Sequence, residues 1–191
     1  MGLLALFRRK PLERPGFLLY TAAVSAARDP WFYGPVAAVP DTLDGRFDLI
    51  GLHAGVLIRR LHNDPDPRGA RAAQAVFDAL FADMDMSLRE MGVGDMSVGK
   101  RVKRMWEGFH GRARAYGAAL DAGDGAALRA ALARNLWRSR PDEPTPAAAR
   151  AVAAHAERMA AALASQPLGA LLRGEVAFPP VPEGAASADA A

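Results

Sequence analysis

The architecture of this chain is most evident in Leu80-Phe-Ala-Asp-Met-Asp-Met-Ser-Leu-Arg-Glu-Met-Gly-Val-Gly-Asp-Met-Ser-Val-Gly-Lys100. Apolar residues recur every three or four positions up to a glycine-rich corner, and the same spacing resumes after it. This period is typical of amphipathic helices, and glycine supplies the positive φ angle that ends a helix. We therefore predict a helix with an acidic end, a corner at residues 92–94, and a basic helix capped by Asp95 or Ser97.

On either side of this corner, proline, glycine and aspartate divide the chain into further helical segments. We expect helices over about residues 17–28, 42–62, 70–91, 95–120, 128–136 and 147–165, with a short turn at 168–172. The second of these is apolar on both sides and should be central. The predicted fold class is all-α, a single compact domain of five to seven helices over 17–173. An N-terminal arm (1–16) precedes it and a disordered C-terminal tail (174–191) follows.

The composition excludes several kinds of chemistry. The 191 residues include no cysteine, so disulfides and thiolate nucleophiles are ruled out. The net charge of +3 is too small to predict a nucleic acid partner by itself. No stretch approaches the ~20 apolar residues of a membrane span. Met1 to Lys10 has an apolar tip followed by basic residues, which we interpret as a frayed terminus with membrane contact as the alternative. No catalytic motif is present, so we expect no enzyme, cofactor or metal.

The histidines and acidic residues are weak candidates for a site. No two of His53, His62, His110 and His155 have the i, i+3 or i, i+4 spacing of helical metal ligands, so we place them at the edges of packed faces. A haem protein or helical enzyme that uses them is the alternative. Residues 83 and 85 are both aspartate, but two positions apart on a helix they point in different directions. We interpret them as a solvated acidic face, with a cation site that includes Asp78 as the alternative.

The strongest local signal is the basic face of the helix predicted at 95–120, formed by Lys100, Lys103, Arg104 and Arg114. Such a face is typical of RNA or ribosome binding, of contact with anionic lipids or an acidic protein, or of an ordinary solvent face. Trp106 falls on the apolar stripe of that helix, which predicts burial. Trp137 falls opposite the apolar residues of the next helix, which predicts an exposed contact residue, with packing on another helix as the alternative.

A series of short motifs then occurs in a characteristic order. They are Phe32-Tyr33, Val39 to Asp48, His53, Arg59 to Leu61, Phe77-Asp78, Asp83-Met-Asp85, Leu88 to Glu90, Gly92 to Asp95, Val98 to Lys100, Gly111-Arg112, Tyr116 and Asn135. Their number and order, from Trp31 to Trp137, resemble the ubiquinol–cytochrome c chaperone family. No Arg/Ser-rich presequence pattern precedes them, so we expect a bacterial member.

The resemblance implies a non-enzymatic assembly chaperone of the cytochrome bc1 complex that binds newly made cytochrome b and needs no cofactor. The implied partners are cytochrome b or other bc1 subunits, with the ribosome and the inner-membrane surface as further candidates and no DNA. We expect a cytoplasmic protein, with a peripheral position at the inner membrane as the alternative. The predicted partner-binding residues are Arg46, His53, Arg60, Asp83, Asp85, Arg89, Lys100 and Arg104. The alternative function is a basic helical RNA- or ribosome-binding module, whose binding would fall steeply with salt.

Overall fold

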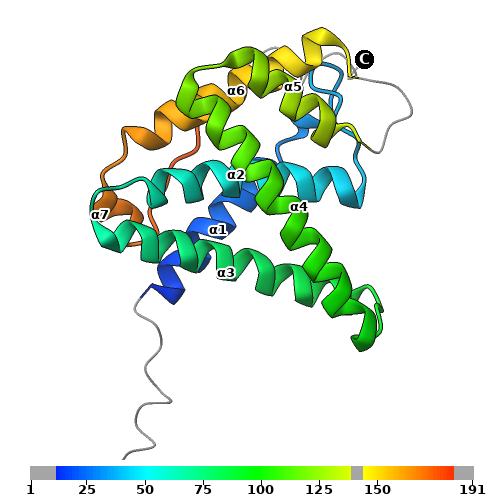
Figure 1. Ribbon diagram of the computed structural model, residues 1–191, viewed down its shortest axis with the longest axis vertical. Helices are drawn as coiled ribbons and strands as arrows, with labels where there is room; N and C mark the ends of the chain where they lie inside the picture. Colours follow the sequence, from blue (N-terminus) through cyan, green and yellow to red (C-terminus); the bar gives the residue numbers. More distant parts are fainter. Residues whose placement is uncertain (1–11, 139–143, 183–191) are drawn as a thin grey trace, which may run out of the picture.

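The computed structural model describes residues 12–138 and 144–182, and every regular element in these ranges is a helix. The elements follow in the order α1 (Glu13–Ala27), η2 (Pro30–Phe32, a 3-10 helix), α2 (Leu43–His62), α3 (Pro67–Glu90), α4 (Asp95–Ala122), α5 (Gly125–Leu136), α6 (Pro146–Ala164) and α7 (Leu168–Leu171) (Figure 1). None of the helices in these ranges combines the length and apolar character needed to span a bilayer. The predicted all-α class, with five to seven helices, is confirmed for the described residues.

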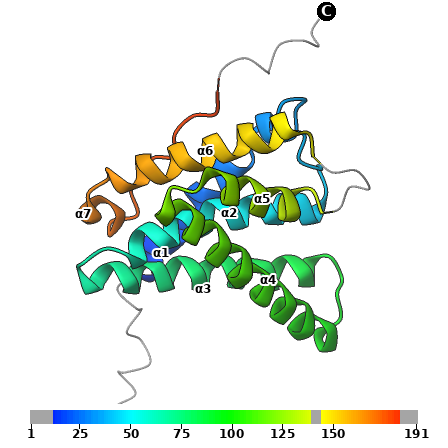
Figure 2. The ribbon, with the colours of Figure 1, turned by 45° about the horizontal axis from the view of Figure 1, so that its top comes forward.

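Helix α2 is the central element. Of its 20 residues 13 are buried, and it packs against α1, α3, α4, α5 and α6. Figure 2 shows it between α6 on one side and α3 on the other. Helix α4 crosses it where Gly51 and Gly55 leave room for Phe109 and Ala113. Thr42 caps α2, its hydroxyl accepting a hydrogen bond from the Gly45 amide at 3.1 Å.

The corner between α3 and α4 ends α3 with a Schellman motif. Gly92 adopts a φ of 77°, and its amide donates to the Arg89 carbonyl at 2.9 Å. The Val93 amide donates to the Leu88 carbonyl at 3.1 Å. These bonds satisfy carbonyl groups that a helix end leaves without partners, and only glycine takes this φ angle without strain. The predicted corner is therefore confirmed, and its glycine has a specific conformational role.

The start of α4 differs from the prediction. Gly94, not Asp95 or Ser97, is the N-cap, and no side chain caps the helix there. Asp95 is instead the first helical residue, where its negative charge is stabilised by the positive end of the helix dipole. Arg89 contacts both Asp85 at 2.6 Å and Asp95 at 2.5 Å, which ties the end of α3 to the start of α4.

Helix α1 begins at Glu13, four residues before the predicted start. Proline is tolerated in the first turn of a helix, so Pro15 does not interrupt it. A Cβ atom on Gly16 would lie only 2.5 Å from the Cβ atom of Ala75, so α1 and α3 approach too closely there for any side chain. The predicted N-terminal arm is therefore helical from residue 13, and its apolar tip lies outside the described residues.

Residues 174–182, which we call the C-terminal strap, lie against the helical core. Val176, Phe178 and Val181 pack on it as partly buried side chains. The side chain of Gln166 exchanges two hydrogen bonds with the backbone of Ala177, at 2.7 and 2.9 Å. The prediction of disorder from Gly174 onward is therefore wrong for the strap, and residues 183–191 lie outside the described part of the chain.

Candidate functional site

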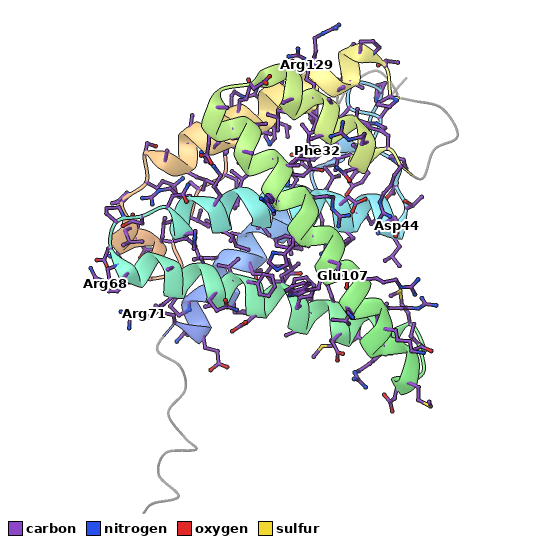
Figure 3. All side chains as sticks on the ribbon, viewed as in Figure 1. Phe32, Asp44, Arg68, Arg71, Glu107 and Arg129 are labelled. Atoms are coloured by element: carbon purple, nitrogen blue, oxygen red, sulfur yellow. The ribbon has the colours of Figure 1, made fainter. Side chains whose placement is uncertain are left out.

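A groove of about 960 Å³ lies between the N-terminal end of α2 and the hairpin formed by α3 and α4. Its lining comes from the end of α1, the η2 turn, the first turns of α2, the last turns of α3, residues 101–112 of α4, and Arg138 after α5. Figure 1 shows the hairpin diverging from this end of α2. Asp44 marks the groove end of α2 in Figure 3, whereas Arg68 and Arg71 mark the opposite side of the molecule. This volume is at the upper end of the range for ligand pockets.

The floor of the groove is apolar and partly exposed. It is lined by Leu43, Phe47, Ile50, Met84, Leu88, Met91 and Met105. Leu43 is 61% exposed and Met91 is 51% exposed, although both are large apolar residues. Methionine is unbranched and adapts to partners of different shape, so it is common on binding surfaces. Exposed apolar residues gathered in one concavity are typical of an interaction site.

Behind this floor lies a buried carboxylate that holds two arginines of the lining. The Asp48 carboxylate is almost wholly buried and contacts Arg138 at 2.7 Å and Arg112 at 3.2 Å. Burial raises the pKa of Asp48, while hydrogen bonding and charge from the two guanidinium groups act in the opposite direction. The Arg112 guanidinium also lies 5.5 Å from the centre of the Phe47 ring. The cluster joins α2, α4 and the end of α5, and thus fixes the back of the groove.

Two further carboxylates in the lining already have partners. Asp41 pairs with Arg46 at 2.5 Å, and the hydrogen bond from Arg46 lowers the pKa of Asp41. Asp83 accepts a hydrogen bond of 2.6 Å from the Tyr20 hydroxyl. Burial and this carboxylate raise the pKa of Tyr20 far above its ordinary range, so the hydroxyl remains a donor.

The structure brings together only part of the predicted partner-binding surface. Three of its residues line the groove, namely Arg46, Asp83 and Arg104. Three more lie on the hairpin beside it, namely Asp85, Arg89 and Lys100. Asp83 and Asp85 point to different partners, as predicted, because one contacts α1 and the other contacts Arg89.

The remaining two predicted residues lie elsewhere. His53 is completely buried, and its Nδ1 atom is 2.8 Å from the Leu49 carbonyl, so this predicted partner-binding residue does not reach the surface. Arg60 donates to the carbonyl groups of Leu163 and Gln166, at 3.1 and 2.9 Å. A cation is stabilised by the negative end of the helix dipole at the carboxyl end of a helix. Arg60 therefore links the end of α6 to α2 and does not face the groove.

His53 and His155 form a buried aromatic cluster with Phe32 and Phe178. The two imidazole centroids are 5.9 Å apart, and Phe32 meets each of them edge-on at 5.3 Å. Burial lowers the pKa of each imidazole to about 4, so both are neutral near pH 7. Figure 3 labels Phe32 within the helical bundle. No group of three side chains suited to hold a metal ion occurs in the part of the chain that the structure describes.

The prediction for Trp106 is wrong, and for Trp137 the structure shows the alternative of a packed side chain. Trp106 was expected in the core but is 45% exposed beside His110, because it lies at the edge of the apolar stripe of α4. Trp137 was expected at the surface but is 2% exposed, and its indole donates to the Ala37 and Ala38 carbonyls. Helix α5 ends at Leu136, so helical periodicity no longer describes the direction of the next side chain.

Sequence reasoning also missed Asp48, Arg101, Arg112 and Arg138 as parts of the site. One signal was available, because Asp48 interrupts an apolar helix and a buried carboxylate requires cationic partners. The identity of those partners was not available, since Arg138 is 90 residues away in the chain.

Comparisons with known proteins agree with this arrangement. The family described as ubiquinol-cytochrome C chaperone matches residues 36–178, which include all of α2, α3 and α4. The crystal structure of the Cbp3 homolog from Brucella abortus matches with a TM-score of 0.77 at 37% identity, over 94% of this chain and 98% of that chain. A comparison with curated proteins gives no match. Because the family match covers well over half of the residues, the chain belongs to the ubiquinol-cytochrome c chaperone family.

Proposed function

We propose that this protein is a non-enzymatic assembly chaperone of the cytochrome bc1 complex and that it holds newly made cytochrome b in the groove. Membership of the family supports the chaperone role in bc1 assembly. The single observation that carries the choice of site is the partly exposed apolar floor enclosed by α2, α3 and α4.

The groove suits an apolar client segment on physical grounds. An amphipathic or apolar helix binds by placing a few side chains in a hydrophobic groove. Burying one large apolar side chain contributes about 1.5–3 kcal/mol, so two or three anchors among the methionines are needed to offset the loss of freedom on association. Charged residues at the rim then set orientation rather than affinity. Arg46, Asp83 and Arg104 occupy such rim positions.

A second surface supports contact with the ribosome during capture of the client. Lys100, Lys103 and Arg114 lie exposed on the outer face of α4, and only Lys103 has an ion pair within the described residues, at 3.8 Å from Glu107. Phosphate-driven association would weaken steeply as salt is raised. Co-sedimentation with ribosomes at low and high salt tests this contact, and binding that ignores salt would count against it.

The proposed function is tested by deleting the gene and restoring it with variants. We expect the deletion to lower cytochrome b and bc1 activity in membranes while cytochrome b messenger remains unchanged. Met91→Lys places a charge in the groove and should fail to restore cytochrome b. Met96→Lys is the matched control, because Met96 is 93% exposed on the same hairpin and does not line the groove. Normal cytochrome b in the deletion strain, or full restoration by Met91→Lys, would refute the proposal.

A further inference from the structure

The charged groups of the groove are unequally engaged. Three of the arginines in its lining are held by carboxylates, Arg46 by Asp41, and Arg112 and Arg138 by Asp48. Three others, Arg28, Arg101 and Arg104, form no ion pair within residues 12–138 and 144–182. The carboxylates of the lining all have partners already, because Asp83 accepts from Tyr20 and Asp44 lies 3.5 Å from Arg138. The groove therefore keeps an excess of positive charge, because six arginines line it against Asp41, Asp44 and Asp83, with Asp48 behind them.

Two of these unpaired guanidinium groups lie on the same helix. Arg101 and Arg104 are exposed, three residues apart on α4, and both line the groove beside Met105. Residues at this spacing lie on neighbouring positions of a helix surface. Guanidinium groups bind carboxylates through paired hydrogen bonds, which gives directional recognition. The α4 wall therefore presents two anion-binding groups above an apolar floor.

We propose that the groove recognises a helical client segment that carries carboxylate side chains along one flank of an apolar face, and that Arg101 and Arg104 pair with those carboxylates. This inference rests on the proposed function and specifies the chemistry of the client. The apolar floor is matched by aliphatic or aromatic side chains of a bound segment. This favours a protein segment over RNA, whose phosphates have no attraction to apolar groups. The charges act mainly on register and selectivity, because each partly solvated ion pair contributes less to the affinity than the apolar floor does.

The test uses the full chain and two labelled helical peptides of about 18 residues, long enough to form helix on binding. Both carry the same leucine-rich face, and they differ only in having two glutamates or two glutamines on one flank. We expect the parent protein to bind the glutamate peptide about tenfold more tightly at low salt. Arg101→Gln/Arg104→Gln should bind both peptides equally, with the affinity of the parent for the glutamine peptide. Lys103→Gln/Arg114→Gln loses the same charge from the outer face of α4 and should keep the preference.

Three results would overturn the inference: equal binding of the two peptides by the parent, a preference that survives in Arg101→Gln/Arg104→Gln, or no binding of either peptide. Vesicles of phosphatidylcholine with and without phosphatidylglycerol provide a further arm. If only the anionic vesicles displace the glutamate peptide, and do so through the same arginines, the groove binds a lipid and the inference fails. The proposed function can fail separately. Normal cytochrome b in the deletion strain would refute it and would leave the peptide preference unchanged.

Discussion

The buried imidazole of His53 predicts a specific loss of stability in mild acid. Its pKa in the folded chain is about 4, against 6.5 for an exposed histidine. The neutral form is therefore the one that the fold accommodates. As the pH falls below 6.5, the unfolded chain takes up a proton at this position and the folded chain does not. Stability conferred by neutral His53 is thus fully present above pH 6.5, is lost progressively through the interval below it, and is wholly lost below about pH 4.

The magnitude follows from the two pKa values. Between about pH 8 and about pH 5, protonation of His53 in the unfolded chain lowers the free energy of unfolding by about 2 kcal/mol. His155 acts in the same direction, because burial also lowers its pKa to about 4. Asp48 acts in the opposite direction, because its pKa is raised in the folded chain. A comparison with a variant at position 53 isolates the first contribution from the other two.

The assay is urea unfolding of the parent chain and of His53→Leu at about pH 8 and about pH 5, with the free energy of unfolding extrapolated to water. The parent should lose about 2 kcal/mol more than His53→Leu between the two pH values. Leu52→Val is the control, because Leu52 is fully buried in the same helix and does not titrate. Equal pH-dependent losses in the parent and in His53→Leu would refute the assignment of a neutral buried imidazole.

Three further changes have defined outcomes in the same unfolding assay. Gly111→Ala should raise the free energy of unfolding by about 1 kcal/mol, because nothing lies within 4 Å of the added Cβ and alanine is the better helix former; a decrease would show that the glycine is needed. Asp48→Ala should lower it by about 3 kcal/mol, because Arg112 and Arg138 lose their shared carboxylate; a change below about 1 kcal/mol would contradict the cluster. Trp137→Phe should cost about 1–2 kcal/mol through the lost indole donor, and a neutral effect would contradict the buried hydrogen bond.

The helices could be predicted from the sequence because their signals are local. Helix α2 was recognised as central from its apolar residues alone, and Gly92 marked the end of α3 because its conformation is needed within one turn of the helix. Errors at helix ends came from competing local signals. Pro15 and Gly16 resembled a loop, but proline fits a first helical turn and Gly16 is required by contact with a helix far along the chain.

The groove could be predicted only in part, because its properties arise between elements. The basic face of α4 was visible in the sequence, yet which of its arginines are free depends on the position of Asp48 and on the direction of α4 across α2. His53 and Arg60 share a stripe on α2 in projection, but α6 and the C-terminal strap cover that stripe. Helical periodicity shows which face of a helix is apolar, but it does not show which element packs against that face.

The C-terminal strap has a consequence for the order in which the protein is completed during synthesis. The ring centroid of Phe178 in the strap lies 5.7 Å from that of His53, a residue in the first third of the chain. Domains begin to fold from the N-terminal side as the chain emerges. Helix α2 can therefore meet α1 and α3 early, but the cluster around His53 stays open on one side until the strap has been made. The last part of the core to close is supplied by residues translated long after its centre.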